Sequence, residues 1–441
     1  MPSDIRFFLA RLNANYWFYP ATFSLAAALL ALGAVYLVRS GFTSFLNDVE
    51  WLLPARPDGA SNMLTVMASS MIGVASTVFS ITIAAVAYAS GNYGPRLLTN
   101  FMEDRGNQLS LATFIGAFVY ALVVLRNVRG EDETPAADAA ASALPGFVPQ
   151  LSLLIAYVLM AVCVAVLVFF LNHIPSSIRI NKVLEGIGRR LLDAIRSTYP
   201  VEDEFSEAVV PKGGEPLTAW ETGYVQLIDF EDLLSIAKDC EGTFSLKVRT
   251  GDFVHRDLPL MEVDGCDPGS IEDKVRECFT LGPTRTPEQD PQFLIDELVE
   301  IGLRALSPGI NDPFTAITAL HWLGAATSDI GRRDLRKNIC GHDEDNCPII
   351  PAPDDFAHYL KRGFGSIRSG VATSPIAAEV MLDVISKAST PLGHTDRQEQ
   401  LRMEGHRLAE QARLHLVGPD LERFEQHKAA FDRTFWQSST A

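Results

Sequence analysis

Charge is scarce in the first 173 residues of this 441-residue chain, and lysine is absent from them. Up to His173 there are eight arginines and ten acidic side chains, and the first lysine is Lys182. The remaining residues hold 29 basic and 44 acidic side chains, a net charge of −15. A charge-poor half before a charge-rich half is typical of a membrane segment followed by a soluble segment. An acidic soluble half repels polyphosphates, which argues against nucleic acid as a partner.

The sequence also lacks the patterns that mark many enzymes and secreted proteins. It contains no Walker A loop, H-E-x-x-H, G-x-S-x-G or dinucleotide fingerprint, so nothing in it argues for catalysis or a cofactor. The first apolar run has no A-x-A site nearby, which argues against a cleaved signal peptide. The absence of regular cysteine spacing predicts reduced thiols in a cytoplasmic setting. The six cysteines are Cys163, Cys240, Cys266, Cys278, Cys340 and Cys347.

Long apolar runs fill the charge-poor half. We expect a four-helix transmembrane domain over residues 20–174, because each apolar run approaches the ~20 residues that cross ~30 Å of hydrocarbon. The fourth helix should end at His173 and Pro175, since proline disrupts a helix interior. The expected spans are residues 20–38, 63–89, 109–125 and 151–171.

Amphipathic segments flank this domain on both sides. In residues 1–19, apolar side chains recur near helical spacing around Arg6 and Arg11, which predicts an interfacial helix. Residues 175–200 predict an amphipathic juxtamembrane helix that either lies on the inner leaflet or forms an oligomer seam. Its apolar face would comprise Ile180, Leu184, Ile187, Leu191 and Ile195.

The Lys/Arg bias predicts the orientation of the spans. Eight basic residues flank one side of the membrane and four flank the other. The excess favours a multi-pass protein of the bacterial inner membrane with both termini in the cytoplasm. The first side carries Arg6, Arg11, Arg96, Arg105, Arg179, Lys182, Arg189 and Arg190, and the second Arg39, Arg56, Arg126 and Arg129.

The second span differs from the others because it is rich in hydroxyl side chains. Small and weakly polar residues recur at helical spacing and form one stripe without a charge. The stripe favours close helix packing, or alternatively the wall of a wet pathway in an oligomer. Its members, the pore-lining candidates, are Ser69, Gly73, Ser76, Thr77 and Ser80.

The acidic half predicts an α+β domain in the cytoplasm. Short strand patterns with intervening turns favour a small β-rich module over residues 215–282. Helical periodicity favours a helical domain over residues 283–437. One helix should begin at Asn311 or Asp312, because an Asx side chain caps the amides and Pro313 at the first helical position loses no hydrogen bond. The fold class is therefore four transmembrane helices plus an α+β domain.

Three segments carry a family resemblance. Residues 304–317 read R-A-L-S-P-G-I-N-D-P-F-T-A-I, residues 285–291 read R-T-P-E-Q-D-P, and residues 92–96 read N-Y-G-P-R. Together they resemble the DUF2254 family of bacterial predicted membrane proteins, in which a serine more usually stands in place of Gly94. The resemblance covers about residues 10–430 and implies a membrane protein, but it carries no established activity.

The family-like segments contain groups that suit a ligand site. The open alternatives are a regulatory small-molecule or ion site and purely structural roles, with Asx caps and an Arg–carboxylate pair. His321, nine residues after Asp312, need not face the same site. The ligand-binding candidates are Arg285, Gln289, Asp290, Arg304, Asn311 and Asp312.

One acidic loop has metal-like residues. Cys340, His342 and Cys347 are weak candidates for a metal site, since zinc sites need a closed set of four ligands at short spacing. The spacing here is not that of a standard zinc knuckle, so the sequence favours a solvated acidic turn and no metal.

Two function classes follow from these patterns. The first is a homo-oligomeric channel or pore-like protein whose cytoplasmic domain gates it or senses a ligand. The alternative is a membrane-anchored scaffold or sensor without transport activity. A membrane-bound enzyme with an unfamiliar site is a third reading. The partners expected are the lipid bilayer, further copies of this chain, and an ion or small-molecule ligand.

Overall fold

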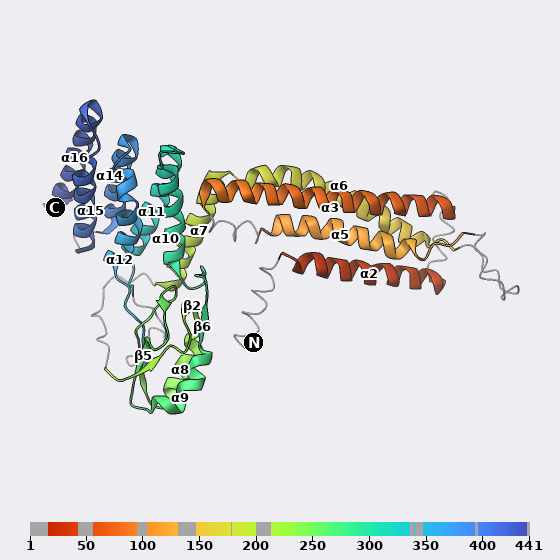
Figure 1. Cartoon of the computed structure of the whole chain (residues 1–441), viewed down its shortest axis with the longest axis horizontal. Coiled ribbons are helices and arrows are strands. Elements are labelled where there is room, and N and C mark those ends of the chain that lie inside the picture. Colours follow the sequence, from red (N-terminus) through yellow and green to blue (C-terminus); the bar gives the residue numbers. More distant parts are fainter. Residues whose placement is uncertain are drawn as a thin grey trace. The chain divides into compact units, whose positions relative to one another are not determined.

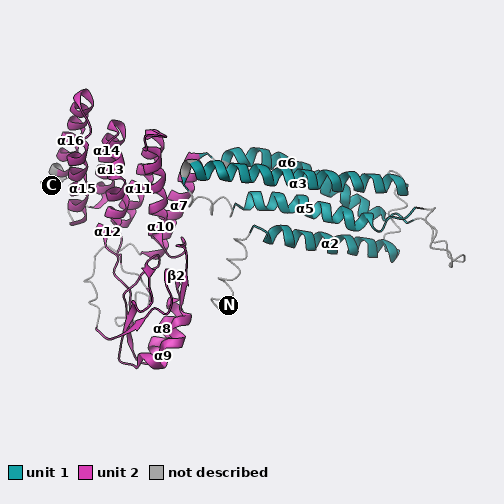
Figure 2. Cartoon of the chain, in the orientation of Figure 1, with its two compact units in different colours: residues 1–179 teal, residues 180–441 magenta. Residues whose placement is uncertain are grey.

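The computed structural model describes residues 16–42, 56–94, 104–130, 147–177, 179–199, 213–335, 339, 347–392 and 396–438. The chain divides into two compact units, which Figure 2 shows in different colours. Unit 1 is Met1–Arg179 and unit 2 is Ile180–Ala441.

The described residues of unit 1 form a bundle of four long helices that lie side by side (Figure 1). Each is long and apolar enough to cross a membrane, as the sequence predicts. α5 is the most buried of them and packs against the other three. Its first turn is capped by Asp104, which accepts hydrogen bonds from the amides of Gly106 and Asn107 at 2.7 and 3.3 Å. The helices are α2 (Phe18–Arg39), α3 (Pro57–Tyr93), α5 (Arg105–Leu125) and α6 (Gln150–Ser177).

Two of these helices extend beyond the expected spans. α3 has 37 residues, so it is roughly 55 Å long and exceeds the hydrocarbon thickness. α6 does not end at Pro175 as expected: the proline lies inside the helix, which continues to Ser177. His173 contributes there instead by pairing with Asp104, with 2.9 Å between Nε2 and Oδ2. Most of the expected interfacial helix of residues 1–19 lies outside the described residues.

Unit 2 combines a layer of helices with two small sheets (Figure 1). α11 is central among the helices and packs against α7, α10 and α14. The helices are α7 (Ile180–Thr198), α10 (Pro291–Ala305), α11 (Pro313–Ile330), α12 (Phe356–Leu360), a π-helix (Lys361–Gly365), α13 (Ser366–Val371), α14 (Pro375–Ser389), a 3-10 turn (Thr390–Leu392), α15 (Asp396–Ala412) and α16 (Gly418–Ser438).

The β-rich part consists of a four-stranded sheet in the order β1-β5-β3-β7 and a three-stranded sheet in the order β4-β2-β6. Helices α8 (Phe230–Asp239) and α9 (Pro268–Glu277) lie in the same part and contact each other. β7 comes from the helical half of the sequence and pairs in parallel with β3. The strands are β1 (Glu215–Thr218), β2 (Gly223–Ile228), β3 (Thr243–Leu246), β4 (Phe253–Val254), β5 (Pro259–Asp264), β6 (Phe279–Gly282) and β7 (Ile349–Ile350).

The amphipathic helix α7 has a different role from either that we expected. Its apolar residues Leu184, Ile187, Leu191 and Ile195 are 0–2% exposed, and α7 packs against α10 and α11 within unit 2. Ion pairs reinforce the contact, as Arg196 Nε lies 2.9 Å from Asp329 Oδ2. The apolar face is therefore part of the core of unit 2 and is not free for the inner leaflet or an oligomer seam.

The thiols are only partly as expected. Cys163, Cys240, Cys266 and Cys278 are free, but Cys347 is disulfide-bonded. The expectation of reduced thiols throughout is therefore wrong for Cys347.

Replacing Leu191 by Ala should test the packing of α7. We expect the free energy of unfolding of unit 2 to fall by about 2–5 kcal/mol, because the change leaves a cavity against α10 and α11. Amide hydrogen exchange of α10 and α11 in the full-length protein in detergent measures the loss. The matched control is Leu192→Ala, since Leu192 is only half-buried and should cost clearly less. Equal exchange in the two variants would contradict this packing.

Candidate functional site

The six ligand-binding candidates lie at opposite ends of α10. Asp290 is the N-cap of α10 and Arg304 lies in its last turn. Fourteen residues of helix separate them by roughly 21 Å. Arg285 and Gln289 belong to the first end, and Asn311 and Asp312 follow the second. The six residues therefore do not form a single site.

The C-terminal group has local structural contacts. Asp312 caps α11 as the sequence predicts, because it accepts from the Thr315 amide at 3.2 Å and from the Thr315 hydroxyl at 2.6 Å. Arg304 lies 3.8 Å from Glu300, one turn earlier on the helix. Asn311 is exposed, and so is His321 on α11.

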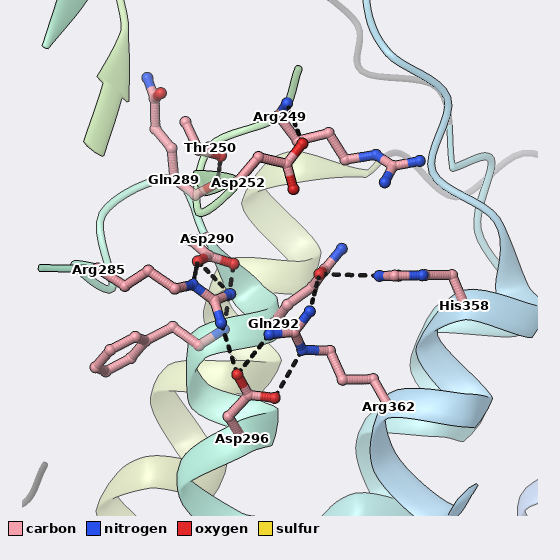
Figure 3. A network of polar contacts seen from close by, with 11 residues as sticks. Arg249, Thr250, Asp252, Arg285, Gln289, Asp290, Gln292, Asp296, His358 and Arg362 are labelled. Atoms are coloured by element: carbon pink, nitrogen blue, oxygen red, sulfur yellow. Dashed lines mark hydrogen bonds and ion pairs between the residues drawn. The ribbon is translucent and has the colours of Figure 1, made fainter. Parts of the chain in front are cut away.

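The N-terminal group joins a network of charged side chains that we call the α10 clasp, formed by Arg285, Asp290, Asp296 and Arg362 (Figure 3). Arg285 donates to Asp290 Oδ2 through Nε at 2.9 Å and through Nη2 at 2.6 Å. Asp296 Oδ2 lies 2.6 Å from Nη1 of Arg285 and 2.6 Å from Nη2 of Arg362. A single carboxylate on α10 thus bridges two arginines from distant parts of the chain.

Gln292 extends the clasp toward α12. Its Oε1 accepts from Arg362 Nη1 at 3.0 Å and lies 3.1 Å from Nε2 of His358. Gln292 and Asp296 are four residues apart and so share one face of α10. Figure 3 shows both of them facing Arg362. Two turns of one helix therefore hold the segment that carries His358 and Arg362.

Gln289 and the turn at Thr250 attach the β-rich part to the clasp. The Gln289 side chain pairs with the backbone of Ile228, donating to its carbonyl and accepting from its amide, both at 3.1 Å. Thr250 Oγ1 donates to the Gln289 carbonyl at 2.6 Å. Gly251, at φ +90°, lies so close that a Cβ there would be 2.1 Å from Asp290 Oδ2. Only glycine fits this approach.

A second group of buried polar side chains joins the end of α7 to the segment before α12. The Tyr199 hydroxyl donates to Asp354 Oδ2 at 2.6 Å and lies 2.8 Å from the Tyr359 hydroxyl. Arg249 Nε lies 3.0 Å from Asp354 Oδ1. Burial raises the pKa of Tyr199 and of Tyr359 far above the ordinary value. Both hydroxyls therefore stay protonated and serve as hydrogen-bonding groups.

The charges of the α10 clasp balance within it. Burial raises the pKa of Asp290, and the nearby Arg285 guanidinium opposes that rise. The hydrogen bonds with Asp296 raise the pKa of Arg362 and hold its positive charge in place. Two arginines face two aspartates, so a further ion would have to compete with these pairs. Among the described residues, no group of three or more His, Cys, Asp or Glu side chains is arranged to hold a metal.

The geometry of the clasp suits a mechanical joint. Arg285 is 11% exposed and Asp290 2%, so the pair is largely removed from solvent. Breaking one member would leave a buried charge without compensation. The clasp therefore holds α10, the π-helix and the β-rich part in one arrangement. A ligand at Arg285, Gln289 and Asp290 stays a prediction.

The sequence analysis missed the clasp partners Asp296, Gln292, His358 and Arg362, and sequence patterns give no sign of the last two. Asp296 and Gln292 carry a weak signal, since they are polar side chains at a spacing of four on a helix with an apolar face. Arg362 lies in the π-helix Lys361–Gly365, a local widening that no periodicity predicts. Such segments are frequent at functional sites.

The remaining candidates are placed as follows. Ser69, Gly73, Ser76, Thr77 and Ser80 are all exposed on the surface of unit 1, and the space beside Gly73 is open. Cys340 and His342 lie outside the described residues. Cys347, being disulfide-bonded, has no thiolate to offer a metal.

Replacing Asp296 by Asn should loosen the clasp. We expect the free energy of unfolding of unit 2 to fall by about 1–3 kcal/mol. Hydrogen bonds to charged groups are among the stronger ones, and the Asp296 carboxylate accepts them from two arginines. Hydrogen exchange of the segment 356–371 in the full-length protein measures it. Glu300→Gln is the control, since its pair with Arg304 is only half-buried and a helix pair at this spacing of four contributes about 0.3–0.5 kcal/mol. An effect no larger than that of the control would show that the clasp is not stabilising.

Replacing Gly251 by Ala should disturb the same joint from the β-rich side. The added Cβ would collide with Asp290 Oδ2, and the alanine would have to adopt a left-handed backbone conformation. We therefore expect the free energy of unfolding of unit 2 to fall by roughly 1–3 kcal/mol. The readout is hydrogen exchange at the start of α10. Gly309→Ala serves as control, because nothing lies within 4 Å of a Cβ there. Similar exchange in both variants would speak against the close approach.

Comparison with known proteins supports the membrane character of the chain. The family model described as "Predicted membrane protein (DUF2254)" matches residues 13–387. Uncharacterized protein Rv1290c of Mycobacterium tuberculosis H37Rv and uncharacterized protein Mb1321c of Mycobacterium bovis are each 31% identical over 390 residues, which cover 85% of this chain and 72% of the relative. No solved structure matches. The family resemblance is confirmed, and the chain belongs to the DUF2254 family of predicted membrane proteins.

Proposed function

We propose that this protein is a homo-oligomeric channel or pore-like protein of the bacterial inner membrane. In this proposal, α3 helices from neighbouring subunits line the pathway and unit 2 is a cytoplasmic regulatory domain. The observation that carries the proposal is the exposed hydroxyl stripe of α3: Ser69, Gly73, Ser76, Thr77 and Ser80.

The two faces of α3 differ in chemistry. The face inside the bundle is apolar, with Leu64, Met67, Met71 and Val78 at most 6% exposed. The opposite face presents the stripe beside exposed apolar side chains such as Ile72 and Phe79, and it carries no charge, since α3 has no Asp, Glu, Lys or Arg after Asp58. Facing lipid, small polar side chains gain nothing over apolar ones. Facing other copies around an axis, they permit close packing and a weakly polar lining.

The hydroxyls are compatible with either a wet or a dry surface. Thr77 Oγ1 donates to the Gly73 carbonyl at 3.0 Å and Ser80 Oγ to the Ser76 carbonyl at 2.9 Å. These bonds satisfy the donors within the helix, and the hydroxyl oxygens still have lone pairs to offer to water or ions. A lining of this kind carries no fixed charge and should discriminate weakly between small cations and anions.

The orientation and the role of unit 2 follow from charge and architecture. The excess of Lys and Arg beside one side of the spans supports cytoplasmic termini and thus a cytoplasmic unit 2. The α10 clasp supports a regulatory role, because it couples the β-rich part to the helices. A ligand that binds one arrangement of unit 2 better than another would shift the equilibrium between the open and closed channel. The free energy of that shift equals the difference between the ligand's binding free energies for the two arrangements.

A membrane-anchored scaffold or sensor is the second candidate. It is favoured by the intrahelical bonds of Thr77 and Ser80, because these two hydroxyl donors of the stripe need no water. In that case the stripe serves helix packing alone, and α3 carries no solute.

Ion flux separates the two candidates. Full-length protein reconstituted in KCl-loaded liposomes should release K⁺ faster than empty liposomes, as read by an external K⁺ electrode. The double variant Ser76→Val, Ser80→Val should reduce the release several-fold at equal incorporation, because it replaces hydroxyls by bulkier apolar groups in the lining. Ile72→Val is the matched control on the same helix, exposed beside the stripe, and should leave the release unchanged.

Release no faster than that of empty liposomes, together with a monomeric protein by chemical cross-linking in the liposomes, would overturn the channel proposal and leave the scaffold. Equal release from wild type and the double variant would remove α3 from the pathway.

A further inference from the structure

Two free cysteines meet at one end of the four-stranded sheet. β3 and β5 are antiparallel, with Thr243 opposite Asp264. Cys240 lies three residues before Thr243 and Cys266 two residues after Asp264. The register of the sheet therefore brings the two cysteines to the same end of the β3–β5 pair, although 25 residues separate them in sequence.

The turns that carry these cysteines are pressed together. Glu241 follows Cys240 at φ 52° and Gly265 precedes Cys266 at φ 92°, both in the left-handed region. A Cβ on Gly265 would lie 3.2 Å from the Glu241 carbonyl oxygen. For Glu241, which is not a glycine, this conformation persists only where the surrounding structure holds it.

Gly242 leaves room for the two sulfurs. A Cβ on Gly242 would lie 3.0 Å from Cys266 Sγ and 3.1 Å from Cys240 Sγ, so both sulfurs border the same small space. Two sulfurs this close to one point are at most about 6 Å apart, so side-chain rotation could bring them to the bonding distance of a disulfide.

Exposure and charge distinguish this pair from the other free thiols. Cys240 and Cys266 are half-buried, whereas Cys163 and Cys278 are buried. Acidic side chains outnumber basic ones beside the pair in sequence, with four exposed acids, Asp239, Glu241, Asp264 and Asp267, against one exposed lysine, Lys238. A negative surface attracts cationic reagents and repels anionic ones, an effect that salt screens.

We propose that Cys240 and Cys266 form a redox-active dithiol that closes to a disulfide by exchange with a neutral or cationic small-molecule disulfide. The site joins the end of α8 to the segment before α9, and its proposed chemistry is independent of channel activity.

The exchange has two balanced steps. The Cys240 thiolate attacks one sulfur of the small disulfide, whose S–S bond breaks and releases one small thiol. The Cys266 sulfur, after giving its proton to water, attacks the Cys240 sulfur of the mixed disulfide and releases the second small thiol. The protein loses two electrons and two protons, and the small disulfide gains them.

The order of the steps follows from the surroundings of Cys266. Burial, the Cys240 thiol and Asp267 raise the pKa of the Cys266 thiol to about 12. The raised pKa disfavours the thiolate of Cys266 at neutral pH, and we therefore assign the resolving role to Cys266.

Peptide mapping tests the proposal on the full-length protein in detergent. The protein is reduced, desalted, treated with cystamine, a cationic disulfide, and digested with trypsin after free thiols are blocked. Cleavage at Lys and Arg places Cys240 in peptide 239–247, Cys266 in peptide 257–274 and Cys278 in peptide 277–285. Peptides 239–247 and 257–274 should appear linked to each other and separate on reduction. The buried Cys278 is the internal control and should stay unmodified.

Single variants assign the roles. Cys266→Ser should hold the small thiol on Cys240 with no cross-link, and Cys240→Ser should lose the cross-link and react several-fold more slowly. Accumulation of the small thiol on Cys240 in the wild type without a cross-link would overturn the proposal. So would two thiols that remain free under conditions that oxidise reduced glutathione completely, or a cross-link from either cysteine to Cys347 instead.

Discussion

Hydrocarbon offers no hydrogen-bonding partner, and this constraint shapes unit 1. A helix that carries hydroxyls into a bilayer has to satisfy their protons within protein. In α3, Thr77, Ser80 and Thr82 donate to the carbonyls four residues earlier at 2.9–3.0 Å, so these three hydroxyl protons need no partner from outside the helix. Because Met67 and Met71 on the other face fill the bundle, the polar face is left for contacts beyond the chain. The proposed function depends on that division.

Buried charge places a related constraint on unit 2, where water is scarce and not absent. Asp329, with its side chain 6% exposed, takes ion pairs from Arg196 of α7 and from Arg333 beyond α11, at 2.9 and 3.1 Å. Glu404 of α15, with its side chain 1% exposed, pairs with Arg368 of α13. Pairs of this kind add little net stability, because desolvation offsets their attraction, but losing one partner is costly. Removing one partner would therefore destabilise this packing, and the α10 clasp extends such buried pairing to the β-rich part.

Local signals in the sequence predict most of the helices and strands, but they do not predict which other segments pack against them. Runs of apolar residues predict the four long helices, and the Asp-Pro pair at Asp312 predicts the start of α11, since both depend on neighbours in sequence. The helical periodicity of α7 correctly predicts an apolar face. It does not indicate whether that face is covered by a bilayer or by other helices, here α10 and α11. Arg362 reaches the clasp through a π-helix, and Cys240 meets Cys266 through strand register. Such long-range contacts depend on packing, which no single segment encodes.

The two ends of α10 show how one local device acquires different roles. Gln289 and Asn311 adopt left-handed conformations at φ 55° and 51°, each followed by a capping aspartate and a proline at the first helical position. Asp312 directs its second oxygen to the hydroxyl of Thr315, three residues on, so its contacts stay local. Asp290 directs its second oxygen to Arg285, which also holds Asp296 and through it Arg362. The same turn thus only starts a helix at one end, whereas at the other it ties three segments together. The two capping aspartates differ in role because the second carboxylate oxygen of Asp312 meets Thr315, whereas that of Asp290 meets Arg285.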